Sequence, residues 1–383
     1  RRQLSGAHQC AKATIEILRN LLGRYNFSSA DHMMKVVRAV GRELIAAAPS
    51  ELTIGNLVRR VLFLIREEHA GQVKEFGAGM VQVFPTKRDR SGSNMSNGDA
   101  SAAAAAANNV LAQSLAGSGS DQAHSQSSAA PLESILDQLN IQSSSSINAE
   151  DFTRYYAGLK GNVIGAINEL YNEIDNVAVI CQRAQEHIHT GELILTYGYS
   201  RIVEQFLKAA GAKRKFQLVV AESNPGLDGH KLAQSLSKVP SIGVTLIPDS
   251  NIYALMARVN KVILSPNAVT ADGGAICPSG MLMVCIAAKE LSVPVVCVTG
   301  AFTLTPLFAH NQSSVLNQLL SPADALPYNA NINVNNVEVN HPAFDYVPPD
   351  LISLYVTNDG NQLPSYVFRQ LSEYYHPQDY YIL

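Results

Sequence analysis

A change of hydrophobic period near residue 192 constrains the fold of this chain more than any other feature of its sequence. Beyond that point, short apolar runs rich in Val and Ile alternate with helical patterns. Strands that alternate with helices are typical of βαβ units, which build a parallel sheet covered on both faces. The sequence therefore predicts an α/β domain over residues 191–383. Its expected strands are 193–196, 216–221, 243–247, 261–264, 294–298 and 351–356, and its expected helices are 201–210, 230–237, 252–259, 281–289 and 364–375.

The residues before this point show only helical spacing. Apolar side chains recur every three or four positions in 13–22, 33–45 and 57–65, and again over 152–188. The last pattern would make a helix of about ten turns, roughly 54 Å long if unbroken. Residues 1–190 are therefore predicted to form an N-terminal helical domain, which precedes a Rossmann-like, mostly parallel α/β domain.

A stretch of different composition interrupts the helical domain. Ala, Ser and Gly dominate residues 91–130. Such a segment buries too little apolar surface to offset the entropy lost on ordering. We therefore expect a disordered insertion at about 86–130, most simply a spacer, followed by a short helix at 131–141.

Composition excludes several classes of function. The net charge of −3 argues against a nucleic-acid binder that neutralises phosphates, and no apolar run is long enough to span a membrane. The five cysteines form no CxxC pair and are typical of buried thiols in a reducing compartment. Charged residues make up only 16% of the chain, against about 25% in ordinary soluble domains. Either an unusually large core or a large partner-covered surface would explain this low share.

Ligands of open parallel sheets bind beyond the carboxyl ends of the strands, so two loops are candidate sites. The loop Thr196–Arg201 ends at a predicted helix N-terminus, where free N–H groups favour an anion. It contains no lysine and no glycine-rich phosphate motif, so an ordinary βα turn is the simpler interpretation. The second loop runs from Ser265 to Gly280 and offers Asp272 and Cys277, but nothing adjacent in sequence would activate the thiol.

Two histidines near the end of the long helical pattern raise the question of a metal site. His187 and His189 are two residues apart and so do not share a helical face. A metal would need an extended geometry and a third ligand. An interaction of these histidines with the C-terminal end of the helix is the simpler interpretation.

Several longer motifs resemble a known family. It joins sugar-phosphate aldose–ketose isomerases to the alpha, beta and delta regulatory subunits of eukaryotic translation initiation factor 2B. The resemblance covers nearly the whole chain outside residues 86–150. The segments that carry it are Pro49–Val61, Glu186–His189, Ile194–Arg201, His341–Ile352 and Leu363–Pro377.

The chain departs from the isomerase pattern at both catalytic positions. The isomerases carry a catalytic cysteine in Thr-His-Cys-Asn where this chain has Gly198, and a catalytic aspartate in Gly-Ala-Asp-Arg where it has Asn267. An asparagine cannot take up a proton as a carboxylate does. We therefore expect no enzyme activity, no catalytic residue, no metal and no cofactor. The candidates for a vestigial pocket or an interface are His189, Tyr197, Gly198, Ser200, Arg201 and Asn267.

The resemblance also implies a function and partners. It implies a non-catalytic scaffold and regulatory subunit of the guanine-nucleotide exchange factor for initiation factor 2, in the cytoplasm. The implied partners are a delta-type subunit, the alpha, gamma and epsilon subunits, and the alpha subunit of initiation factor 2, with no nucleic acid and no membrane. The alternative is a sugar-phosphate isomerase or a sugar-phosphate-sensing protein that uses the same cleft.

Overall fold

The structure is a computed structural model that describes residues 6–25, 27, 29–83, 149–309, 318–327 and 337–380. Arg1–Ala70 and Ile141–Leu383 form one compact unit, and Gly71–Asn140 form a second. The insertion predicted over 86–130 and the short helix predicted over 131–141 lie outside the described residues. Among the helices that are described, none combines the length and the apolar character that crossing a bilayer requires.

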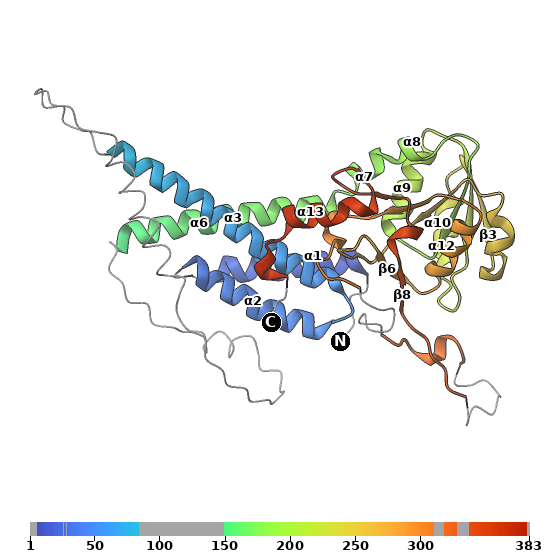
Figure 1. Ribbon diagram of the computed structural model, residues 1–383, viewed down its shortest axis with the longest axis horizontal. Coiled ribbons are helices and arrows are strands. Elements are labelled where there is room, and N and C mark those ends of the chain that lie inside the picture. The colour runs from blue at the N-terminus through green and yellow to red at the C-terminus, as the bar shows by residue number, and fades with distance from the viewer. Residues whose placement is uncertain are drawn as a thin grey trace, which may run out of the picture. The chain divides into compact units, whose positions relative to one another are not determined.

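Long helices precede the sheet, as the spacing of apolar residues predicted. They are α1 (Ala7–Arg24), α2 (Ala30–Ala47), α3 (Leu52–Val83) and α6 (Ala149–Asp175). The Ser29 hydroxyl accepts the His32 N–H at 3.0 Å and so caps the start of α2. Helix α6 packs along α1 and extends from there toward the sheet (Figure 1).

The helix predicted over 152–188 is divided in the structure. Helix α6 ends at Asp175, and two short helices follow, α7 (Ala178–Gln182) and α8 (Ala184–His187). Asp and Asn side chains compete with the helical backbone for hydrogen bonds, which explains an end at Asp175–Asn176. The prediction of one unbroken helix is therefore wrong, although its apolar face continues through buried residues of all three helices: Ile174, Ile180 and Ala184.

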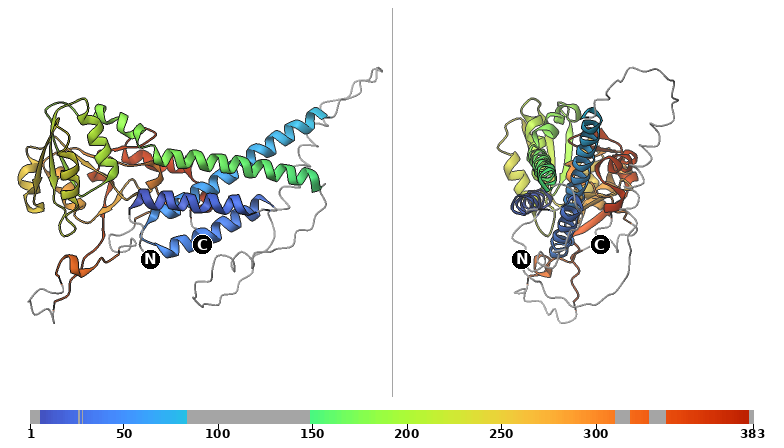
Figure 2. Two further views of the ribbon diagram at one scale, coloured as in Figure 1. Left: turned by 180° about the vertical axis from the view of Figure 1, so that it is seen from behind. Right: turned by 90° about the vertical axis from the view of Figure 1, so that its left-hand side faces the viewer.

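The main sheet has seven strands in the order β10-β9-β7-β4-β1-β2-β3. All neighbouring pairs are parallel except β10–β9, so the predicted mostly parallel α/β fold is confirmed. Helices follow the strands and pack beside the sheet (Figures 1 and 2). The strands are β1 (Leu193–Tyr197), β2 (Phe216–Ala221), β3 (Ile242–Ile247), β4 (Lys261–Leu264), β7 (Val295–Val298), β9 (Leu354–Val356) and β10 (Asn361–Gln362), and the helices are α9 (Arg201–Gly211), α10 (Asp228–Leu236), α11 (Ile252–Met256) and α12 (Met281–Glu290).

A small antiparallel sheet, built from two strands between β4 and α12 and a third strand after β7, was not predicted from the sequence. Its order is β5 (Ala268–Val269), β6 (Ala275–Pro278), β8 (Phe344–Val347). Strands of two to four residues are too short to show an alternating pattern. The C-terminal helix α13 (Val367–Tyr374) buries Val367 and Leu371 in the core beneath the main sheet.

Candidate functional site at the carboxyl edge of the sheet

Tyr197, the last residue of β1, lies buried at the carboxyl edge of the main sheet. Its hydroxyl donates to the Ser279 carbonyl at 3.3 Å and so ties β1 to the loop before α12. Burial raises the pKa of the Tyr197 hydroxyl, and the nearby Asp249 and Asp345 carboxylates raise it further, against a hydrogen bond with Ser223 that lowers it. The hydroxyl is therefore neutral at physiological pH and acts as a hydrogen-bonding group.

Gly198 turns the chain from β1 toward α9. Its φ of 68° lies in the left-handed region, which a residue without a Cβ adopts at little cost. A Cβ built there would lie 3.6 Å from the Ser223 hydroxyl oxygen, so conformation rather than crowding favours the glycine. Ser200 then precedes α9, but its side chain makes no capping hydrogen bond.

Two carboxylates at this edge accept hydrogen bonds from backbone N–H groups that an anionic ligand could otherwise use. Asp345, on β8, accepts the Gly280 N–H at 2.7 Å, at the N-terminus of α12. Asp249, just after β3, accepts the N–H groups of Ser223 and Asn224 at 3.0 and 2.8 Å. The N–H groups of Ser223, Asn224 and Gly280 are therefore already bonded within the chain.

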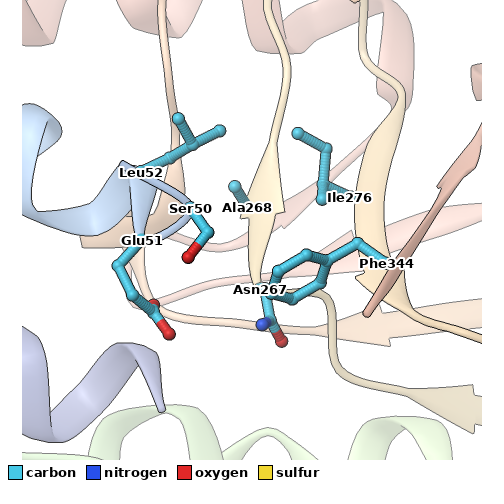
Figure 3. A pocket seen from close by; sticks show the side chains of 7 residues that line it. All are labelled: Ser50, Glu51, Leu52, Asn267, Ala268, Ile276 and Phe344. Carbon is cyan, nitrogen blue, oxygen red and sulfur yellow. The ribbon is translucent and has the colours of Figure 1, made fainter. Parts of the chain in front are cut away.

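Asn267 lies in a different pocket, between the start of α3 and the small sheet. Figure 3 shows its amide beside the ring of Phe344, together with the Ser50 hydroxyl and the Glu51 carboxylate. Burial raises the pKa of Glu51, and a hydrogen bond with the Gly6 backbone opposes that rise. The cavity is about 10 Å³, which holds one water at most. No residue of the loop Tyr197–Arg201 lines it.

The structure does not bring the six predicted residues together. His189 lies at the opposite, amino edge of the sheet, with its Nδ1 2.7 Å from the Arg214 Nη1. Arg201 starts α9 and carries an exposed side chain. Its charge lowers the pKa values of His8 and Asp175, after the larger effects of burial on His8 and of the Lys12 hydrogen bond on Asp175, so Arg201 lies toward α1 and α6.

Of the other residues singled out in the sequence, His187 is hydrogen-bonded and Cys277 is buried. The His187 Nε2 lies 2.9 Å from the Asn361 Oδ1, which links α8 to β10. No group of three or more His, Cys, Asp or Glu side chains in the described part of the chain is placed to hold a metal ion. Burial raises the pKa of Cys277 well above its ordinary value, which keeps the thiol protonated.

Sequence reasoning missed Asp249, Asp345 and Glu51. Asp249 comes two residues after a predicted strand, so its place at the carboxyl edge could have been inferred. Asp345 lies within the motif His341–Ile352, but its contact with Gly280 depends on the pairing of β6 with β8, which the sequence did not predict. No sequence signal places Glu51 beside Asn267.

Comparison with known proteins gives a consistent result over the whole chain. The profile of the initiation factor 2 subunit family matches residues 3–364. Translation initiation factor eIF2B subunit beta of Dictyostelium discoideum is 38% identical over 397 aligned positions, which cover 99% of this chain and 93% of that protein. The corresponding subunit of Schizosaccharomyces pombe is 31% identical, over 99% of this chain and 94% of that protein.

A solved structure agrees with these sequence relatives. The crystal structure of eIF2B beta from Chaetomium thermophilum has a TM-score of 0.67 and 25% sequence identity, over 99% of this chain and 89% of that one. A chain in the crystal structure of the tetrameric eIF2B-beta2-delta2 complex from C. thermophilum has the same fold. Its TM-score is 0.64 at 23% identity, over 98% of this chain and 90% of that one.

Proposed function

The chain belongs to the initiation factor 2 subunit family, and we propose that it is a beta-type regulatory subunit of eIF2B that acts in translation initiation by binding other proteins. The observation that carries this proposal is its likeness to the Dictyostelium beta subunit over 99% of the chain. That match includes the helical region, α1 to α8, as well as the α/β region from Leu193 onward.

The partner we propose first is a delta-type subunit. The C. thermophilum neighbour of the same fold was solved as a beta2-delta2 tetramer. The surface of the α/β region supports such an assembly, because large apolar side chains on α11 and α12 are exposed. Tyr253, Met283 and Ile286 are 58%, 46% and 53% exposed. Groups of exposed apolar side chains mark interaction sites. The alpha, gamma and epsilon subunits and initiation factor 2 complete the proposed set of partners.

The same proposal takes the chain to be non-catalytic. The isomerases that this chain resembles use a thiol and a carboxylate, and Gly198 and Asn267 supply neither group. Asp249 and Asp345 already occupy the N–H groups of Ser223, Asn224 and Gly280 at the carboxyl edge, so these groups are not available to a sugar phosphate. The cavity beside Asn267 is about 10 Å³, whereas small-molecule sites measure roughly 300–1,000 Å³. These features argue against the alternative of a sugar-phosphate isomerase or sensor.

Reconstitution with the other subunits tests this function. Guanine-nucleotide release from initiation factor 2 is measured with the complete exchange factor and with the same set of subunits lacking this chain. We expect the chain alone to release no nucleotide, and its omission to abolish the regulated activity of the assembly. Conversion of ribose 1,5-bisphosphate or methylthioribose 1-phosphate by the isolated chain would contradict the proposal.

A further inference from the structure

The segment Tyr374–Tyr380 contacts both the α/β region and the helices α2 and α3. It begins at the end of α13 and includes the single turn Pro377–Asp379. Figures 1 and 2 show it running back from α13 toward the N-terminal helices.

The first half of the segment is anchored in the α/β region. Tyr375 is buried in the same core as Val367 and Leu371, and its hydroxyl donates to the Leu304 carbonyl at 2.8 Å. The Tyr374 hydroxyl donates to the carboxylate of Asp359, which also accepts a hydrogen bond from Gln370. These contacts fix the point from which the segment leaves the sheet.

The other half is anchored on α2 and α3 through Asp379. Its side chain is 0% exposed and accepts hydrogen bonds from two arginines. The Arg38 Nη2 on α2 lies 2.6 Å from Oδ1, and the Arg66 Nε on α3 lies 3.0 Å from Oδ2. Charge-assisted bonds of this kind are about twice as strong as neutral ones.

Two more arginines of α3 hold the backbone of the segment. The Arg59 Nε donates to the Tyr380 carbonyl and the Arg60 Nη1 to the Tyr374 carbonyl, both at 3.1 Å. Arg60 also lies over the Tyr374 ring, 4.6 Å from its centroid. Arginines from α2 and α3 thus bind the segment along its whole length.

We propose that Tyr374–Tyr380 is a strap that fixes the N-terminal helices on the α/β region, and that Asp379 is its lock. Helix α2 is tied to the strap through the Arg38–Asp379 pair, whereas α3 also reaches the α/β region directly. The Asn56 amide of α3 donates to the Phe302 carbonyl at 3.3 Å, next to the carboxyl end of β7. Removal of the lock therefore loosens α2, whose buried apolar face still packs on its neighbours, while the sheet stays folded.

Amide hydrogen exchange on the full chain tests the strap. Asp379→Asn keeps the size of the side chain and leaves both arginines without their counter-charge. The matched control is Asp350→Asn, which removes the same charge from a solvent-exposed pair with Lys289. In Asp379→Asn we expect amides of α2 to exchange at least about tenfold faster, with a weaker dependence on added urea than the amides of β1 and β2, because α2 opens while the sheet stays folded. Asp350→Asn leaves both sets unchanged.

Two results would overturn the proposal. One is an α2 exchange rate in Asp379→Asn equal to that in Asp350→Asn. The other is an α2 exchange rate that depends on urea as steeply as the rates of β1 and β2, which would mean that α2 opens only when the whole molecule unfolds. If Asp379→Asn cannot be recovered folded, Arg38→Met is measured in its place, because Arg66 and the carboxylate remain paired, and the same two results decide.

Discussion

Asn267 stands where the resembling isomerases carry a catalytic aspartate, and its side chain lines a cavity of only about 10 Å³. Its backbone N–H donates to the Ile276 carbonyl at 2.8 Å, and an alanine keeps that bond. We therefore expect Asn267→Ala to shift the thermal midpoint of unfolding by no more than about 2 °C, because the half-buried amide lines only a small cavity and the backbone bond is kept. Differential scanning calorimetry measures this shift.

The same variant checks the absence of catalytic function at this position. In the reconstituted exchange factor, Asn267→Ala should leave the rate of nucleotide release within about twofold of the unaltered assembly. A tenfold loss of exchange in an assembly of correct mass would mean that Asn267 takes part in function directly.

Asp379 makes stability depend on pH in a predictable direction. Burial alone would raise the pKa of this carboxyl, but hydrogen bonds from Arg66 and Arg38 hold the pKa below its ordinary value. As the pH falls, the unfolded chain therefore binds a proton before the folded chain does. The contribution of Asp379 to the free energy of unfolding is full above about pH 4, the ordinary range of an aspartate, and is lost as the pH falls through the folded-state pKa.

Urea unfolding at a series of pH values below about 5 tests this dependence. The free energy of unfolding of the unaltered chain should fall more steeply with decreasing pH than that of Asp379→Asn, since the asparagine cannot titrate. Parallel curves would show that the two arginines do not perturb Asp379.

At this scale, sequence reasoning reached residues that stand in a local motif, but not residues that act through distant partners. Gly198 and Asn267 follow from comparison with a motif, and both lie beyond the ends of parallel strands as expected. Asp345 and Asp379 act through partners 65 and more than 300 positions away, Gly280 and Arg38. Contacts over such distances depend on the tertiary fold and leave no local pattern.

Helix α2 approaches α3 closely at Gly41, where a larger side chain would not fit without a shift. A Cβ on Gly41 of α2 would lie 2.5 Å from the Val58 Cγ1 of α3. Alanine is the better helix former by about 1 kcal/mol, yet overpacking costs about 1–3 kcal/mol. We expect Gly41→Ala to lower the free energy of unfolding, and Val58→Ala in the same chain to recover part of that loss.

A glycine of α6 provides the matched control. A Cβ on Gly161 would meet nothing within 4 Å. Gly161→Ala should therefore raise the free energy of unfolding, by up to about 1 kcal/mol. Both variants are measured by urea unfolding. Loss of stability at Gly161 and none at Gly41 would contradict the packing described here.

Periodicity predicted the long elements well and the short ones poorly. The runs 216–221 and 261–264 match β2 and β4 to the residue, because buried parallel strands read as continuous apolar stretches. Strands β5 and β10 have two residues each, too few to show a period. The break at Asp175 also escaped prediction, because the apolar stripe continues across it.

At the scale of the whole molecule, the low share of charged residues left open a large core or a large partner surface. The exposed apolar side chains of α11 and α12 favour the second explanation. The proposed strap agrees with a role in assembly, since a scaffold binds several partners at once only if its helical region and its α/β region keep fixed positions.

Native mass spectrometry tests the central claim, that this chain works by assembly, most directly. The full chain is co-expressed with a delta-type subunit, and the complex is weighed without denaturation. We predict a species containing two copies of each chain. A stable monomer of this chain, with the delta-type subunit left unbound, would contradict the account.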